Sequence, residues 1–158
     1  MDRIPYVLLT SGLVFFDRLS KWWAATSLAV GEPVSLLGQS IRLTRVHNVG
    51  AAFGLYPGSS SLLVAASGIA SIVLIMLLLF GRVRGILVRI GMATVLAGAL
   101  GNLIDRLSYG YVLDFFEIRG FPVFNLADAC ITVGAALIVL HVLLGGEGHR
   151  SRKQADRV

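Results

Sequence analysis

Four long apolar segments dominate the chain, and shorter polar stretches separate them. A segment of about 20 helical residues crosses the ~30 Å hydrocarbon core of a bilayer. Backbone groups in lipid must be hydrogen-bonded within the segment, which favours helices. The pattern therefore predicts an all-α membrane protein with four transmembrane helices, at approximately residues 4–23, 61–80, 85–107 and 123–144. The second segment contains no charged residue, whereas Arg89 and Asp105 shorten the uncharged part of the third.

The first apolar segment also resembles a secretory signal peptide. However, Asp17, Arg18 and Lys21 stand where a small-residue cleavage site would be expected, and further apolar segments follow. We therefore interpret this segment as the first membrane span.

Two unequal connections are predicted on the outer side of the membrane. In the longer one, at about residues 29–60, the stretch 34–46 is punctuated by Pro33 and Gly38 and indicates a short pair of strands. The shorter one, at about residues 108–122, is rich in aromatic residues, which suit the membrane interface. We expect one domain over residues 1–145, followed by a polar cytoplasmic tail at residues 146–158.

Composition agrees with a membrane protein. Hydrophobic residues make up 56% of the 158 residues and charged residues only 15%, against roughly 25% charged in an average soluble domain. The net charge is +5, but the basic residues flank apolar segments instead of forming one stripe, so no nucleic-acid partner is expected. With four alternating spans, most of these residues fall on one side of the membrane. Such basic residues mark the cytoplasmic side, which predicts that both termini are cytoplasmic. The basic residues on this side are Arg3, Arg82, Arg84, Arg89, Arg150, Arg152, Lys153 and Arg157.

Several polar residues lie inside the predicted spans, at a similar depth. Asp17 is about 20 Å along a helix that starts at residue 4. Asn102 and Asp105 are near the outer end of the third span, and Asn125 and Asp128 are in the first turns of the fourth. Ionisable groups inside a membrane are costly and indicate a functional site.

The spacing of these residues leaves structural alternatives open. Asp17 and Lys21 are four residues apart, which suits an ion pair, and we interpret that pair as structural. Asn102, Asp105 and Arg106 share a helix face, and the last two could form a charge pair that marks the end of a helix.

Other candidates are equally ambiguous from the residues alone. Asn125 could cap the fourth helix, with Asp128 favouring its dipole. Asp114, flanked by apolar residues, could be a solvated loop acid. Cys130, the only cysteine, is interpreted as a packing residue. The three histidines are His47, His141 and His149, and their spacing is not typical of metal ligands. Neither a metal nor another cofactor is therefore expected.

Five motifs, taken together and in this order, resemble those of the lipoprotein signal peptidases. This family, also called signal peptidase II, consists of aspartyl peptidases of bacterial inner membranes. The resemblance covers nearly the whole chain, and its motifs here are Asp17-Arg18-Leu19-Ser20-Lys21, Asn48-Val49-Gly50-Ala51-Ala52-Phe53, Gly101-Asn102-Leu103-Ile104-Asp105-Arg106, Val112-Leu113-Asp114-Phe115 and Phe124-Asn125-Leu126-Ala127-Asp128.

The resemblance implies a role for each motif. Asp114 and Asp128 would be the catalytic dyad. The asparagines Asn48, Asn102 and Asn125 would position the substrate or the dyad, and Asp17, Asp105 and Arg106 would hold the site together. Lys21 belongs to this support through its expected ion pair. Gly50 and its small neighbours would let a substrate backbone approach closely, although a plain tight loop is an equal alternative.

The resemblance also implies an activity. The enzyme would be an aspartyl endopeptidase that removes signal peptides from prolipoproteins whose cysteine already carries diacylglycerol, cutting on the amino side of that cysteine. The longer outer connection would form a small extracytoplasmic β-sheet, and the shorter one a periplasmic flap over the site. We expect a monomer in contact with membrane lipid, with its active site near the periplasmic face. The resemblance also implies that globomycin inhibits the enzyme.

Two carboxylates suit amide hydrolysis. One, ionised, can take a proton from water, while the other, protonated, can hydrogen-bond the carbonyl oxygen. For Asp114 and Asp128 to meet, the chain must fold back through Gly120 and Pro122. A proton-coupled transporter and a membrane scaffold remain alternatives. The transporter predicts polar groups across the whole membrane depth, whereas these cluster in the outer third.

Overall fold

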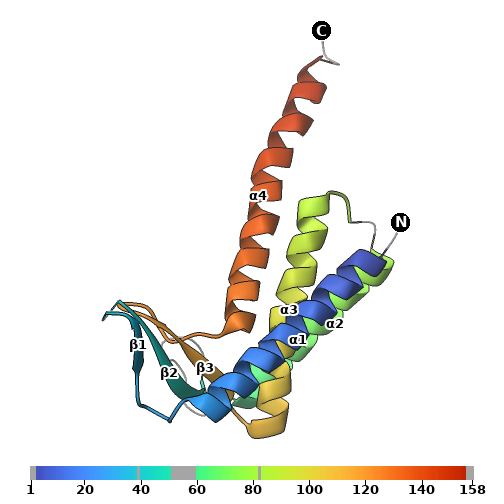
Figure 1. Ribbon diagram of the computed structural model, residues 1–158. Coiled ribbons are helices and arrows are strands. Elements are labelled where there is room, and N and C mark those ends of the chain that lie inside the picture. Colours follow the sequence, from blue (N-terminus) through green and yellow to red (C-terminus); the bar gives the residue numbers. More distant parts are fainter. Residues whose placement is uncertain (1–2, 39, 51–59, 82, 156–158) are drawn as a thin grey trace.

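The computed structural model describes residues 3–38, 40–50, 60–81 and 83–155 (Figure 1). Within them lie four helices and a small sheet, in the order α1 (Ile4–Ser27), β1 (Val34–Leu37), β2 (Ile41–Asn48), α2 (Ser60–Phe80), α3 (Ile86–Tyr109), β3 (Val112–Ile118) and α4 (Leu126–Ala155). The predicted fold class is confirmed. One difference is that α4 continues as a helix through the polar segment that was expected to be a tail.

Three of these helices are long and apolar enough to cross a membrane, over Ser61–Phe80, Ile86–Tyr109 and Leu126–Leu144. α1 is 24 residues long, but its second half contains charged residues. Asp17 and Lys21 are buried against the other helices, whereas Phe15, Phe16 and Trp22 are exposed. α1 therefore turns an apolar surface outward and its charges inward.

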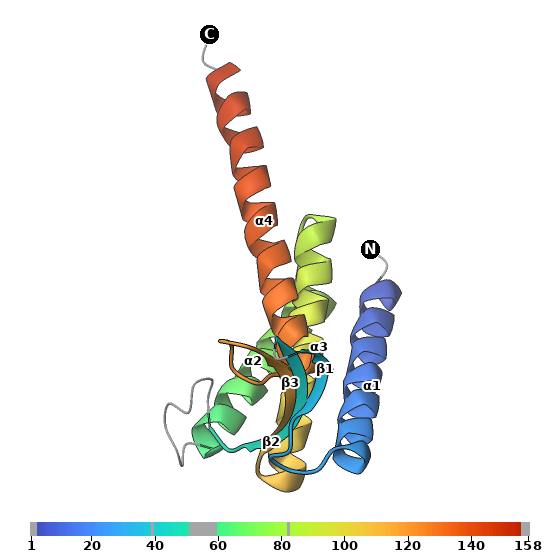
Figure 2. The same cartoon turned by 60° about the vertical axis from the view of Figure 1, so that its left-hand side comes forward.

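α3 is the central helix and contacts each of the other three (Figures 1 and 2). Small residues bring α3 and α4 close together. A Cβ atom added at Gly134 of α4 would lie 2.6 Å from the carbonyl oxygen of Gly91 of α3. Close backbone approach at small residues is a common mode of helix packing in membranes, and it fixes α4 against α3.

The three strands form an antiparallel sheet in the order β1-β2-β3. The predicted strand pair is confirmed as β1 and β2, with β2 extending to Asn48. The segment expected as a flap contributes β3, which pairs with β2 so that Val46 lies opposite Asp114. Pairing satisfies the backbone groups of an apolar segment that would otherwise be poorly solvated. Residues 51–59, which include Ala51-Ala52-Phe53 of the second motif, lie outside the described residues.

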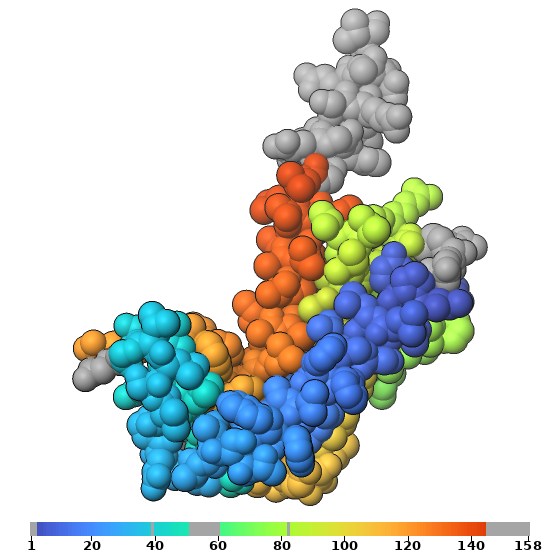
Figure 3. All heavy atoms as spheres, in the orientation of Figure 1, coloured from blue at the N-terminus to red at the C-terminus, as the bar shows by residue number. Residues whose placement is uncertain are grey.

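The sheet lies at one end of the helical bundle. Leu43 of β2 and Leu113 and Phe115 of β3 pack against Ala24 and Leu28 at the end of α1. Figure 1 shows that the start of α1 and the end of α4 both lie on the side away from the sheet. The space-filling view is hollowed between the sheet and α4 (Figure 3).

Candidate active site

A buried cluster of charges joins α1 to α3. The Lys21 Nζ atom lies 2.9 Å from Asp17 Oδ2 and 2.9 Å from Asp105 Oδ2, and it donates to Asn102 Oδ1 at 3.0 Å. The other oxygen of Asp105 pairs with the Arg18 guanidinium. The Asp17, Lys21 and Asp105 side chains are at most 2% exposed. Two carboxylates and two cations therefore balance in a cluster whose inner three side chains are nearly inaccessible to water, as such burial requires.

The same cluster holds the segments that carry the other candidate residues. Asp17 Oδ1 accepts a hydrogen bond from the backbone N–H of Ala127 in the first turn of α4, at 3.0 Å. Asp105 Oδ2 accepts one from the N–H of Leu113 in β3, at 3.3 Å. A carboxylate at a helix N-terminus satisfies a free N–H and interacts favourably with the dipole. The cluster thus fixes α4 and β3 relative to α1 and α3.

These contacts decide two of the alternatives left open by the sequence. The ion pair of Asp17 with Lys21 is confirmed. The possible pairing of Asp105 with Arg106 is wrong, because Asp105 pairs with Arg18 and Lys21. Arg18 is thus a further residue of the cluster, and its position next to Asp17 in the first motif is the sequence signal for it.

Asp114 and Asp128 lie on either side of Asn125. The Asn125 side-chain amide donates to Asp114 Oδ1 at 2.6 Å. Asn125 and Asp128 exchange two hydrogen bonds, from Asp128 N to Asn125 Oδ1 at 3.0 Å and from Asn125 N to Asp128 Oδ2 at 3.3 Å. This is the geometry of a capping box at the start of α4. The capping interpretation is correct, and the same residues bring the two carboxylates together.

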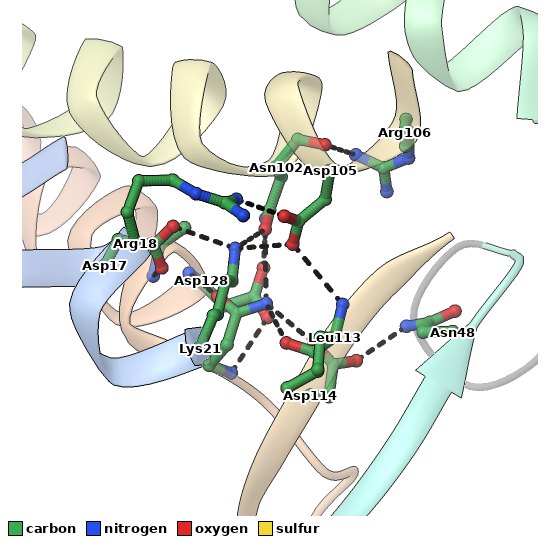
Figure 4. Close-up of polar contacts among 12 residues, drawn as sticks. Asp17, Arg18, Lys21, Asn48, Asn102, Asp105, Arg106, Leu113, Asp114 and Asp128 are labelled. Atoms are coloured by element: carbon green, nitrogen blue, oxygen red, sulfur yellow. Dashed lines mark hydrogen bonds and ion pairs between the residues drawn. The ribbon is translucent and has the colours of Figure 1, made fainter. Parts of the chain in front are cut away.

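Two further asparagines hold the outer sides of the pair (Figure 4). Asn102 Nδ2 donates to Asp128 Oδ1 at 2.7 Å, while its Oδ1 accepts from Lys21 and from Asn125. Asn48 Nδ2 donates to Asp114 Oδ2 at 2.9 Å, and its Oδ1 accepts from the N–H of Gly50 at 3.0 Å. The structure therefore gathers the three asparagines of the motifs around the two aspartates.

Asp114 is only 1% exposed. Burial raises the pKa of its carboxyl group from 3.8 to about 6, and the nearby Asp128 carboxylate adds to the rise, while hydrogen bonds from Asn48 and Asn125 oppose it. Two carboxylates that cannot both ionise cheaply tend to share a proton. This arrangement suits a pair in which one acid holds its proton up to a pH of about 6.

Both carboxylates line an open pocket of about 720 Å³ between the sheet, α3 and α4. Its volume lies in the range of roughly 300–1,000 Å³ common for ligand sites. Phe121, Phe124 and Ile131 contribute an apolar wall. Arg106 also lines the pocket, and its guanidinium donates a long hydrogen bond of 3.5 Å to the carbonyl of Asn102. The pocket can thus accept an apolar chain and expose it to two acids and a cation.

His47 is a pocket residue that the sequence pattern did not single out. Its ring stacks on Tyr111 at 4.1 Å between centroids, and it lines the pocket beside Asn48. Burial and the nearby Arg45 charge lower its pKa. Its sequence position next to a motif asparagine was the available signal. Among the described residues, no three His, Cys, Asp or Glu side chains are grouped to bind a metal.

A helical membrane protein with two aspartates in one pocket has the features of a membrane-embedded aspartic peptidase. Two solved structures of bacterial membrane enzymes share this fold. One aligns with a TM-score of 0.85 and 28% identity, covering 91% of this chain and 90% of that chain. The other has a TM-score of 0.79 and 29% identity, covering 88% and 92%.

The family model described as Signal peptidase (SPase) II matches residues 9–144, and the chain belongs to this family of aspartic-type peptidases. The lipoprotein signal peptidase of Moorella thermoacetica is 38% identical over 141 residues, covering 89% of this chain and 94% of the relative. That of Syntrophomonas wolfei subsp. wolfei is 42% identical over 138 residues, covering 85% and 90%. The chain is thus a multi-pass membrane peptidase.

Proposed function

We propose that this chain removes signal peptides from prolipoproteins as an aspartyl endopeptidase, with Asp114 and Asp128 as the catalytic pair. Its substrates carry diacylglycerol on a cysteine, and it cuts on the amino side of that cysteine. The observation that carries the assignment is that both carboxylates line one pocket and are bridged by Asn125.

The chemistry needs one protonated and one ionised carboxyl group. The ionised group takes a proton from water as the water oxygen attacks the scissile carbonyl carbon, and the protonated group hydrogen-bonds the carbonyl oxygen. The carbon–nitrogen bond then breaks, and a carboxyl proton passes to the leaving amine. The raised pKa of Asp114 supports a shared proton, and the titration belongs to the pair.

The neighbouring residues act as positioning residues in this scheme. Asn48 and Asn125 fix the two oxygens of Asp114, and Asn102 fixes Asp128. Lys21 in turn fixes Asn102 from inside the charge cluster. Arg106 has a guanidinium at the pocket wall and is available to a substrate carbonyl.

The pocket also suits the proposed substrate. Signal peptides and diacylglycerol chains are apolar, and the pocket wall around Phe121, Phe124 and Ile131 is apolar. We place the sheet end on the periplasmic side of the bacterial inner membrane, with both termini cytoplasmic, because the arginine-rich α2–α3 connection lies at the opposite end. The enzyme acts as a monomer, and globomycin binds in the same pocket.

Cleavage of a purified diacylglyceryl precursor tests the proposal. Asp114→Asn and Asp128→Asn should each reduce the rate by about 10²–10⁴-fold or more, the usual effect of losing an acid or base group. Glu117→Gln is the matched control, because this acid lies on the same strand but pairs with Arg42. It should cleave normally, and globomycin should stop the wild-type enzyme.

Cleavage at the wild-type rate by either folded Asp→Asn variant would refute the assignment of the pair. No cleavage of a diacylglyceryl precursor by folded wild-type protein would refute the proposed substrate.

A further inference from the structure

A second cavity lies at the end of the bundle away from the sheet, where α1, α2 and α3 meet. Its volume is about 190 Å³, and Val7, Leu78 and Leu96 are among the apolar residues that line it. The Thr10 hydroxyl group in its wall already donates to the carbonyl of Ala93 at 3.1 Å. The cavity is smaller than a typical ligand pocket of roughly 300 Å³ or more, so it suits part of one acyl chain.

The mouth of this cavity is basic. Arg3 and Tyr6 line both the cavity and a small adjoining hollow, which Arg89 also lines. The Arg89 guanidinium lies 6.0 Å from the centre of the Tyr6 ring, and Arg89 Nε donates to the carbonyl of Val83 at 2.9 Å. These contacts join the start of α1 to the α2–α3 connection.

Charge at this end has one dominant sign. The described residues of segments 3–10 and 75–96 include the arginines Arg3, Arg84 and Arg89 and no Asp or Glu. Asp2 precedes the first segment and, like Arg82, lies outside the described residues. Basic pockets between transmembrane helices bind anionic lipid headgroups, and the planar guanidinium group matches phosphate geometry.

We propose that this cavity binds one anionic phospholipid, with its phosphate between Arg3 and Arg89 and part of one acyl chain among the apolar residues. Thr10 lies about 10 Å along α1 from Arg3, so a chain entering at the arginines runs into the hydrocarbon region. Free phosphate would gain nothing from the apolar cavity, which favours a lipid. The site lies at the opposite end of the bundle from the catalytic pocket and does not depend on the proposed function.

The test is native mass spectrometry of the purified protein in micelles that contain equal amounts of dioleoyl phosphatidylglycerol and dioleoyl phosphatidylcholine. The attraction of two arginines, Arg3 and Arg89, predicts retention of phosphatidylglycerol on the order of 25-fold over phosphatidylcholine. Arg3→Gln should reduce this preference by about fivefold. Arg119→Gln, which removes an exposed arginine at the sheet end, is the matched control and should leave it unchanged. Leu78→Trp should reduce retention of phosphatidylglycerol by filling the cavity.

Thermal unfolding of each variant ensures that only folded proteins are compared, with Val7→Phe replacing Leu78→Trp if the latter does not fold. Equal retention of the two lipids, or equal effects of Arg3→Gln and Arg119→Gln, would overturn the proposal. Displacement of the lipid by millimolar inorganic phosphate would indicate a free-phosphate site and overturn it as well. Unchanged retention of phosphatidylglycerol by Leu78→Trp or Val7→Phe, which fill the cavity, would also overturn the proposal.

Discussion

Replacing Lys21 with methionine removes the central cation of the charge cluster while keeping most of the side-chain volume. The Lys21 side chain is 2% exposed, and its Nζ atom contacts oxygens of Asp17, Asp105 and Asn102 at 2.9–3.0 Å. Without it, two buried carboxylates face one guanidinium, that of Arg18. Removing one partner of a buried ion pair costs about 3–5 kcal/mol. At about 2–4 °C per kcal/mol for a chain of this size, the melting temperature should fall by about 6–20 °C.

Thermal unfolding in detergent, followed by tryptophan fluorescence, measures this effect. The matched control is Arg42→Met, because the Arg42–Glu117 pair lies on the sheet surface with Arg42 37% exposed. A surface pair contributes about 0–1 kcal/mol, so this variant should melt within about 4 °C of wild type. The double variant Lys21→Met with Asp17→Asn restores the charge balance and should recover part of the loss.

Two results would refute this reasoning. One is a Lys21→Met protein that melts as close to wild type as the Arg42→Met control does. The other is a double variant that is no more stable than Lys21→Met alone, since that would mean that unbalanced charge is not the cause.

Two further predictions concern the pocket. Because ionising buried Asp114 costs about 3 kcal/mol, wild-type stability should fall as the pH rises from about 4 through about 6. Asp114→Asn lacks this fall but loses one hydrogen bond of about 1 kcal/mol, so it should melt above wild type at pH 8 and slightly below it at pH 4. A variant less stable than wild type at pH 8 would contradict this. Arg106→Gln should slow cleavage while leaving the melting temperature nearly unchanged, because Asp105 pairs with Arg18 and Lys21 instead. A fall in melting temperature as large as that of Lys21→Met would contradict this.

The charge cluster illustrates how far sequence spacing reaches. Asp17 and Lys21 are one helical turn apart, so their pairing could be predicted from α1 alone. Asp105 and Arg106 are adjacent, and adjacent residues on a helix do not face each other. The partners of Asp105 come instead from α1, more than 80 positions earlier. No local pattern records which face of α1 meets which face of α3.

The outer segments show a similar limit. The β1–β2 pair was predictable because Pro33 and Gly38 bracket its first strand. The segment of β3, Val112–Ile118, has no regular alternation of apolar and polar residues, so its sequence did not indicate a strand. Its conformation follows from pairing with β2, which lies on the far side of α2 and α3 in the chain.

The apolar segments, the positions of the polar residues within them and the motifs of the family are all evident from the amino-acid sequence alone. These features depend on neighbouring residues, whose spacing along a helix is fixed by backbone geometry. In contrast, the three-dimensional packing of the chain is what brings Asp114 on β3 and Asp128 on α4 to the same pocket across 14 positions of sequence. That meeting depends on how α1 and α3 pack, because their buried carboxylates accept hydrogen bonds from the backbone of β3 and α4 and fix the positions of both elements.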